Sequence, residues 1–253
     1  MAPVFFKIGN FVVYWYGVMI AIAIIVSSFL FEKFAKEKSY PDNTLERIIF
    51  ITVFYGLIGA RLLSVLINYH YYSAHPFEVL NIRDGALSME GAVILALISL
   101  IIFLKAHKLN VLPTLDMVSL SAPVGQAIGM LGCFLGGCFY GIKTTGIWGV
   151  KIPFLAYKVY PVSLFELAGN LIIFLILFLF YMEKHKDGEI VGWYLILYGI
   201  LRYGLDGLRG DLIPTSFFNL YPAQIFGGIL FLIGAFWIFS IMRSKNENYD
   251  SVK

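Results

Sequence analysis

Four polar side chains recur along one apolar segment in the last third of the chain, at spacings typical of a single helix face. They are Tyr198, Arg202, Asp206 and Arg209, separated by four, four and three residues, and residues three or four apart lie on the same side of a helix. Arginine binds phosphate groups through paired hydrogen bonds. Arg202 and Asp206 are spaced to pair with each other, but that pair leaves a second arginine and a tyrosine on the same face. We expect this face to line a polar cavity.

A second candidate for chemistry is the stretch Gly129–Gly141, GMLGCFLGGCFYG, which contains both cysteines and five glycines. Each glycine costs a helix about 1 kcal/mol relative to alanine, so this density predicts close backbone approach, a broken helix or a ligand against the main chain. Cys133 and Cys138 lie about 140° apart on a continuous helix and cannot bridge. A break at Gly136 and Gly137 brings them together. Small buried thiols, a structural disulfide and a reactive pair all remain open.

The elements that position these residues are predicted to be membrane helices. Charged residues make up 14% of the 253 residues, against about 25% in a soluble domain, and apolar runs of about 17–25 residues can cross a bilayer. We therefore predict an all-α polytopic membrane protein, with one transmembrane domain over residues 1–253. The seven predicted helices lie at about 11–31, 45–69, 87–104, 112–138, 161–182, 190–208 and 221–242.

The distribution of lysine and arginine predicts how these helices are oriented. Ten of these residues follow the first, third, fifth and seventh runs, and six lie on the opposite side. Because cytoplasmic loops carry the excess of positive charge, we expect the N-terminus outside and the C-terminus in the cytoplasm. The first run has no small-residue cleavage site, so we expect it to be a retained helix and not a signal peptide.

Alternating helix directions place several polar side chains in the outer half of the membrane: Tyr16, Arg61, Glu90, Cys133, Cys138, Glu166, Arg202 and Asp206. An arginine within a membrane segment, such as Arg61, is by default functional or paired. Tyr16 is either an interfacial anchor or a hydroxyl that faces the bundle interior. Glu90 is either a carboxylate favoured at a helix N-terminus, or a base or a partner for a buried arginine. Arginines in a cavity inside the membrane suit a phospholipid headgroup.

These residues resemble the bacterial prolipoprotein diacylglyceryl transferase family over nearly the whole chain. Phe5–Gly17 is similar to the opening of the family, Gly125–Gly141 to its signature stretch, and Tyr198-Gly-Ile-Leu-Arg202 to its arginine helix. The resemblance implies seven membrane helices. It also implies transfer of the diacylglyceryl group of phosphatidylglycerol to a cysteine thiol of an exported prolipoprotein, which the enzyme meets as a signal peptide with its cysteine in the bilayer of the bacterial inner membrane.

The resemblance also implies which residues act. Catalytic roles fall to Arg202, Tyr16, Tyr198 and Glu90, and contacts with phosphatidylglycerol fall to Arg61, Arg202, Arg209, Gly132 and Gly141. The chain departs from the family pattern at several positions. Met130 stands for an arginine, Cys133 for an asparagine, Cys138 for a glutamate, Glu90 for the histidine of His-Gly-Gly, and Tyr160 for the histidine of His-Pro.

Two hypotheses of different class follow from these residues. The first is a working diacylglyceryl transferase with a remodelled site. The second is a diverged relative in which Cys133 and Cys138 carry out thiol, redox or soft-metal chemistry on the same scaffold. We expect no cofactor, no metal site and no nucleic-acid partner. A channel or transporter is disfavoured because the sequence shows no internal repeat and almost no polar residue in the cytoplasmic half.

Overall fold

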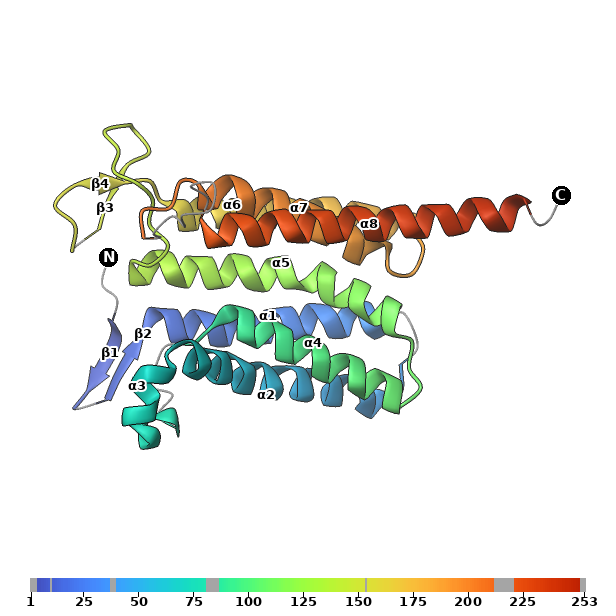
Figure 1. Cartoon of the computed structure of the whole chain (residues 1–253), viewed down its shortest axis with the longest axis horizontal. Coiled ribbons are helices and arrows are strands. Elements are labelled where there is room, and N and C mark those ends of the chain that lie inside the picture. Colours follow the sequence, from blue (N-terminus) through green and yellow to red (C-terminus); the bar gives the residue numbers. More distant parts are fainter. Residues whose placement is uncertain are drawn as a thin grey trace. The chain divides into compact units, whose positions relative to one another are not determined.

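The structure, a computed structural model, describes residues 4–9, 11–36, 40–80, 87–152, 154–211 and 221–250. Six of its helices are long and apolar enough to cross a membrane, which confirms an all-α membrane protein (Figure 1). They are α1 (Trp15–Lys36), α2 (Asp42–Ile67), α4 (Met89–Ala106), α5 (Val111–Gly136), α6 (Val162–Met182) and α8 (Pro222–Asp250).

A further long helix, α7 (Glu189–Asp206), corresponds to the predicted run 190–208. It is not among the six because its 18 residues include three charged side chains, Glu189, Arg202 and Asp206. Two of these, Arg202 and Asp206, belong to the polar face of the segment, so the same residues mark the candidate site and lower the hydropathy of the helix. A seventh membrane span therefore remains a prediction.

Short elements precede α1 and lie between later helices. The first is a hairpin of β1 (Val4–Ile8) and β2 (Phe11–Tyr14), in which Val4 pairs with Tyr14 and Ile8 with Phe11. Residues 11–14 therefore form a strand and not the start of the predicted helix 11–31, because β-branched and aromatic side chains favour a paired strand. The other short elements are α3 (Tyr69–Ala74), the 3-10 helix η1 (Pro76–Leu80), β3 (Val150–Lys151) and β4 (Lys158–Val159).

The chain divides into two compact units, and a single transmembrane domain over residues 1–253 stays a prediction. Unit 1 comprises Met1–Phe31 and Leu112–Lys253, and unit 2 comprises Glu32–Val111. Within unit 1, α1 packs on a glycine face of α5. A Cβ atom at Gly132 would lie 2.7 Å from Cβ of Met19, and one at Gly125 would lie 3.1 Å from Oγ of Ser27. Small residues let membrane helices approach closely, so much of the glycine content of α5 serves this contact.

Glycines also bring α7 against α8. A Cβ atom at Gly199 would lie 2.7 Å from the carbonyl oxygen of Gly227, and one at Gly234 would lie 2.8 Å from that of Gly192. The N-terminus of α7 is held by Asp116 of α5, whose carboxylate oxygens accept from the backbone N–H groups of Gly188 at 2.6 Å and Val191 at 2.9 Å. A carboxylate at this end satisfies unpaired N–H groups and complements the helix dipole. These contacts fix the height of α7, and therefore of its arginine, within unit 1.

Within unit 2, the antiparallel helices α2 and α4 cross at a pair of glycines. A Cβ atom at Gly59 would lie 2.3 Å from the carbonyl oxygen of Gly91, and one at Gly91 would lie 2.3 Å from that of Gly59. Side chains of any size are excluded from both positions. Because Gly59 precedes Arg61 by two residues and Gly91 follows Glu90 directly, this crossing places both predicted site residues at the same end of the helix pair.

Candidate active site

The polar face of α7 carries an arginine that lies between two carboxylates. Nη1 of Arg202 donates to Oε1 and Oε2 of Glu166, on α6, at 3.0 and 3.2 Å. Nε of Arg202 lies 3.1 Å from Oδ2 of Asp206, a charge contact without a hydrogen bond. Glu166 and Asp206 are each only 1% exposed. The predicted Arg202–Asp206 pair is present, and Glu166 joins it across the helix interface.

A second arginine extends this cluster at the end of α7. Nη1 of Arg209 donates to Oδ1 of Asp206 at 3.3 Å, and its Nε and Nη2 donate to the two carboxylate oxygens of Asp211 at 2.9 and 2.8 Å. Asp206 thus bridges the two arginines. Asp211 lies outside the helical spacing that predicts the polar face, and its position two residues after Arg209 is the local signal that indicates this contact. Two guanidinium groups face three carboxylates, so the cluster has one excess negative charge.

The cluster leaves one group available for a ligand. Within the described residues, Nη2 of Arg202 donates no hydrogen bond, whereas its other two nitrogens contact Glu166 and Asp206. The Arg202 side chain is 11% exposed. A guanidinium fixed at two nitrogens presents the third in a set direction. The arrangement can therefore offer two N–H donors to an anion without breaking either ion pair.

The glycine-rich stretch ends α5 with a left-handed cap. The N–H of Cys138 donates to the carbonyl of Cys133 at 2.9 Å, and that of Gly137 donates to the carbonyl of Phe134 at 3.3 Å. Gly137 has φ +80°. This is the Schellman arrangement, in which glycine takes the left-handed position and the side chains three residues before and two after the cap come together. The predicted break at Gly136 and Gly137 is present, although α5 ends at residue 136 and not at 138.

The same cap explains why the two cysteines are close. Cys133 and Cys138 occupy the two positions that meet in this motif, and both are free thiols. A hydrogen bond from the Cys133 thiol lowers the pKa of Cys138, against the opposing effect of burial. Nothing here favours a structural disulfide. Among the described residues, no group of three histidine, cysteine, aspartate or glutamate side chains is placed to hold a metal ion.

Phe139, the residue after the second cysteine, supports the arginines. Its ring centre lies 3.8 Å from Cζ of Arg209 and 5.6 Å from Cζ of Arg202. Its φ of +55° is uncommon for a residue with a bulky side chain, and such strain tends to occur at functional sites. Phe139 is not among the predicted site residues, because a single aromatic residue among glycines does not indicate its backbone conformation.

Backbone contacts hold the glycine-rich stretch against the end of α7. Gly141 forms a bridge with Arg209, the N–H of Ile142 donates to the carbonyl of Leu208 at 2.9 Å, and that of Gly210 donates to the carbonyl of Tyr140 at 3.0 Å. A Cβ atom at Gly141 would lie 2.8 Å from both Cβ and the carbonyl oxygen of Tyr160. Gly141 thus lets three segments meet beside the arginine cluster.

The remaining predicted residues of unit 1 lie on the helices around this cluster. Tyr198 lies one turn before Arg202, and its ring stacks on that of Tyr194 at 5.6 Å. Tyr16 lies at the start of α1, 44% exposed, with its Cα 3.4 Å from where a Cβ of Gly132 would be. Gly132 is therefore explained by contact between α1 and α5. Its predicted contact with the lipid substrate remains a prediction, as does that of Gly141.

Arg61, in unit 2, is bound to the backbone of the connection after α2. Its Nε donates to the carbonyl of Val79 at 2.8 Å, and Nη2 donates to the carbonyl of Glu78. Its guanidinium also lies 5.0 Å from the ring centre of Tyr72. Arg61 is 8% exposed, so it holds η1 and α3 in place. A contact of Arg61 with phosphatidylglycerol stays a prediction.

Glu90 lies in the first turn of α4, where the structure gives it a local role. Its Oε2 accepts from Oγ of Ser88 at 2.8 Å, and Oγ of Ser88 in turn accepts from the N–H of Gly91 at 3.3 Å. This is the helix N-terminus that the sequence offered as one alternative, with the carboxylate exposed. A role for Glu90 as a base stays a prediction.

The fold and the site together define a polytopic membrane protein with a buried arginine–carboxylate cluster where α5, α6 and α7 meet. Comparison with known proteins then identifies the family. The profile of prolipoprotein diacylglyceryl transferases matches residues 3–240, and the chain belongs to this family.

Three curated relatives bear the name phosphatidylglycerol–prolipoprotein diacylglyceryl transferase. That of Finegoldia magna is 35% identical over 212 residues, which cover 83% of this chain and 85% of the relative. That of Clostridioides difficile is 31% identical over 248 residues, 98% of each chain. That of Thermotoga maritima is 33% identical over 253 aligned positions, 96% of this chain and 85% of the relative.

Proposed function

We propose that this protein transfers the diacylglyceryl group of phosphatidylglycerol to the cysteine thiol of an exported prolipoprotein, in the bacterial inner membrane. The names of its relatives support the two substrates. The observation that carries the proposal is the arginine–carboxylate cluster, because it holds Arg202 rigidly while leaving Nη2 for an anionic group. The alternative based on Cys133 and Cys138 has no comparable support, because their proximity follows from the helix cap.

In the proposed reaction, the thiolate sulfur of the acceptor cysteine attacks the glycerol carbon that carries the phosphate ester. A carbon–sulfur bond forms, the carbon–oxygen bond breaks, and glycerol phosphate leaves with the electron pair. Arg202 donates to the phosphate and stabilises the charge that develops on the leaving oxygen. The thiol proton goes to a base, since the thiolate is the nucleophile. Glu90 is the residue that we propose for this role, with Tyr16 and Tyr198 as hydrogen-bonding partners of the substrates.

The cluster also explains how Arg202 acts without rearranging. A preorganised donor needs no reorientation when charge develops in the transition state. Glu166 and Asp206 provide this orientation, and Arg209 keeps Asp206 in place. In this proposal Arg209 positions the cluster and adds positive charge near the phosphate.

The experiment that tests the proposal is a transfer assay with purified protein. Phosphatidylglycerol labelled in its acyl chains is mixed with a prolipoprotein peptide that carries the acceptor cysteine, and the lipidated peptide is measured. We expect product with the cysteine peptide and none with its serine counterpart. Arg202→Ala should lower the rate by at least 100-fold, as expected when a preorganised donor is lost. Lys184→Ala, which removes an exposed positive charge at the far end of α6, should match wild type.

A cellular version of the assay separates the two hypotheses. The chain is expressed in bacteria depleted of their own diacylglyceryl transferase, and lipoprotein modification is followed. Rescue by wild type and by the Cys133→Ser/Cys138→Ser double variant, but not by Arg202→Ala, would support the transferase and a packing role for the cysteines. Inserted, stable wild-type protein that neither rescues nor forms product in vitro would contradict the proposal.

A further inference from the structure

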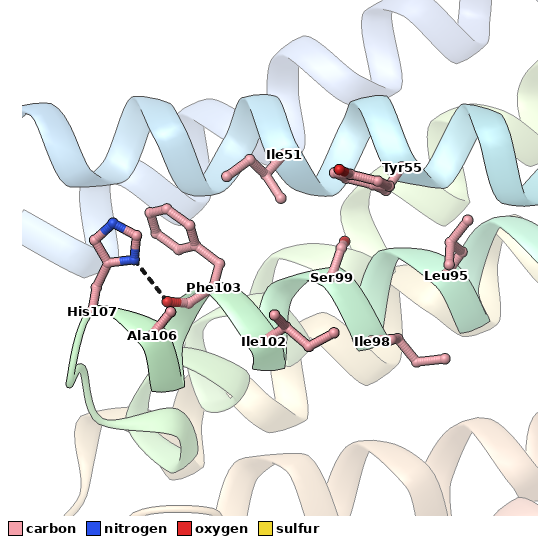
Figure 2. Close-up of a pocket in the computed structure, with 9 residues that line it drawn as sticks. All are labelled: Ile51, Tyr55, Leu95, Ile98, Ser99, Ile102, Phe103, Ala106 and His107. Carbon is pink, nitrogen blue, oxygen red and sulfur yellow. Dashed lines mark hydrogen bonds between the residues drawn. The ribbon is translucent and has the colours of Figure 1, made fainter.

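Unit 2 contains an apolar groove between two of its helices. It has a volume of about 350 Å³, and its walls are Ile51 and Tyr55 of α2 and Ile98 and Ile102 of α4 (Figure 2). Ile98 is 46% exposed and Ile102 is 63% exposed. This volume lies at the small end of the range for ligand pockets, so the groove suits a single narrow apolar chain.

The length of the groove matches one leaflet of a bilayer. Its lining on α4 and the C-cap of this helix extends from Leu95 to His107, which corresponds to about 18 Å at 1.5 Å per residue. The hydrocarbon core of a membrane is about 30 Å thick, so one leaflet is about 15 Å. The groove therefore extends from the end of α4 to about the depth at which the acyl chain of a lipid ends.

Both walls of the groove continue into a basic residue. On α2, Arg47 precedes Ile51 by one turn, and on α4, Lys105 follows Ile102 by one turn. Arg47 precedes Gly59 by the same number of residues as Phe103 follows Gly91. Because α2 and α4 are antiparallel, Arg47 lies level with Phe103, close to Lys105. The two basic residues, Arg47 and Lys105, therefore lie at the same end of the helix pair. Residues at such spacings share a helix face, which puts these positive charges at the mouth of the groove.

A third basic residue stands in a conformation that usually belongs to glycine. Lys108 has φ +54° and follows the C-cap of α4. The N–H of Lys108 donates to the carbonyl of Lys105 at 3.2 Å, and that of Leu109 donates to the carbonyl of Leu104 at 2.9 Å. Glycine would satisfy this Schellman cap with less strain, so the lysine adds a charge at the groove mouth at a cost in backbone energy.

His107 completes the mouth of the groove. Its Nδ1 lies 2.9 Å from the carbonyl oxygen of Phe103, and its ring is 4.1 Å from the Phe103 ring. A carbonyl oxygen only accepts, so Nδ1 carries the proton. This contact, drawn in Figure 2, leaves Nε2 as the nitrogen of the imidazole that is free of the helix.

We propose that this groove binds an anionic phospholipid, with one acyl chain between α2 and α4 and its phosphate at Arg47, Lys105 and Lys108. The groove has apolar walls about as long as one leaflet is thick and a positively charged mouth, which matches a lipid with a negative headgroup. A zwitterionic lipid would be attracted less strongly by the three positive charges. A second copy of the same surface would bring like charges together at the mouth. The groove opens at the Arg47 end of α2, whereas Arg61 and Glu90 lie at the opposite end of the α2–α4 pair. Within unit 2, this lipid site is therefore distinct from the residues predicted to act on the lipid substrate.

Photo-cross-linking in nanodiscs tests the proposal. The full-length protein is placed in nanodiscs that contain a trace of phosphatidylserine or phosphatidylcholine with a photoreactive group in one acyl chain. Phosphatidylserine is anionic but has no glycerol headgroup, so labelling does not depend on the proposed transferase reaction. We expect label on peptides from residues 47–55 and 95–107, at least three-fold more with phosphatidylserine than with phosphatidylcholine.

Two pairs of variants make the result specific. Ile98→Trp fills the groove and should lower the label on these peptides several-fold. Ile94→Trp, at a 54% exposed position one turn away that does not line the groove, should leave it unchanged. Lys108→Gly should reduce the preference for phosphatidylserine and raise the thermal stability of the protein, because it removes both the charge and the strain. A lysine with only a structural role would not affect the preference.

Three outcomes would overturn the proposal. Equal labelling by both lipids would show that the groove does not recognise charge. Equal loss of label in Ile98→Trp and Ile94→Trp would show that the lipid contacts the whole helix surface. Loss of label on residues 47–55 when two copies of the protein share a nanodisc would show that the groove is an interface between copies of the chain.

Discussion

The guanidinium carbon of Arg209 lies 3.8 Å from the centre of the Phe139 ring. Phe139 belongs to the glycine-rich stretch Gly129–Gly141, whose other side chains are mostly small or apolar. The same ring lies 5.6 Å from the guanidinium carbon of Arg202. An aromatic face attracts a cation and blocks its movement on one side. Phe139 therefore connects the glycine-rich stretch to both arginines of the site.

Replacing this ring should lower activity without unfolding the protein. Phe139→Leu removes the aromatic face, and a cation–π contact of about 0.5–2 kcal/mol corresponds to a loss of roughly two- to thirty-fold in kcat/KM. Phe139→Tyr keeps the face and should retain most of the activity. The measurement is the transfer assay, with thermal unfolding of each variant as the control. Equal activity of the Leu and Tyr variants would remove Phe139 from the site.

Two glycines of unit 1 should respond in opposite ways to alanine. A Cβ atom at Gly141 would lie 2.8 Å from Cβ and the carbonyl oxygen of Tyr160, whereas Gly204 has nothing within 4 Å. Overpacking at Gly141 should cost about 1–3 kcal/mol and separate the segments beside Arg209, so activity falls. Gly204→Ala, within α7, should stabilise the protein by up to about 1 kcal/mol. Thermal unfolding in detergent measures whether each variant is less or more stable than wild type. A stable, active Gly141→Ala protein would contradict the packing argument.

The two thiols should differ in reactivity. The hydrogen bond from Cys133 lowers the pKa of Cys138, so the Cys138 thiolate forms at a lower pH than it would without this hydrogen bond. Alkylation of Cys138 should therefore begin at lower pH, and Cys133→Ala should move its rate profile to higher pH. The measurement is the rate of maleimide labelling of Cys138, in the wild-type protein and in Cys133→Ala, between about pH 6 and pH 9, a range in which cysteine thiols titrate. An unchanged profile would mean that the two thiols do not interact.

The sequence predicts most of the fold but only part of the site. Hydropathy locates the helices because a bilayer imposes their length, and helical spacing finds the Arg202–Asp206 pair because that contact is local. The approach of Glu166 to Arg202 depends on how α6 packs on α7 through Gly169 and Leu201, and no periodicity encodes it.

Other features depend on backbone conformation, which is harder to predict. The break at Gly137 was predictable because glycine tolerates positive φ, but the positive φ of Phe139 opposes the preference of its residue type. The strand Phe11–Tyr14 looked like the start of a helix because its apolar residues continue into α1. The binding of Arg61 to the carbonyls of Glu78 and Val79 depends on a turn whose path the sequence does not indicate.

The bridging carboxylate, Asp206, allows binding and chemistry to be separated. It contacts both Arg202 and Arg209, and with Glu166 and Asp211 it gives the cluster one more negative than positive charge. Asp206→Asn removes that excess and leaves each arginine with one carboxylate. We expect KM for phosphatidylglycerol to fall by roughly five-fold, which corresponds to about 1 kcal/mol of additional attraction.

The rate constant should change in the opposite direction. Without the Asp206 charge, Arg202 keeps only its contact with Glu166, so the donor is less well fixed and kcat should fall by about ten-fold or more. Asp211→Asn is the matched control, because it makes the same charge change but does not contact Arg202, and it should lower KM with little effect on kcat. The measurement is the dependence of the transfer rate on the phosphatidylglycerol content of nanodiscs. If both variants lower kcat equally, charge alone controls the site, and the positioning role of Asp206 is wrong.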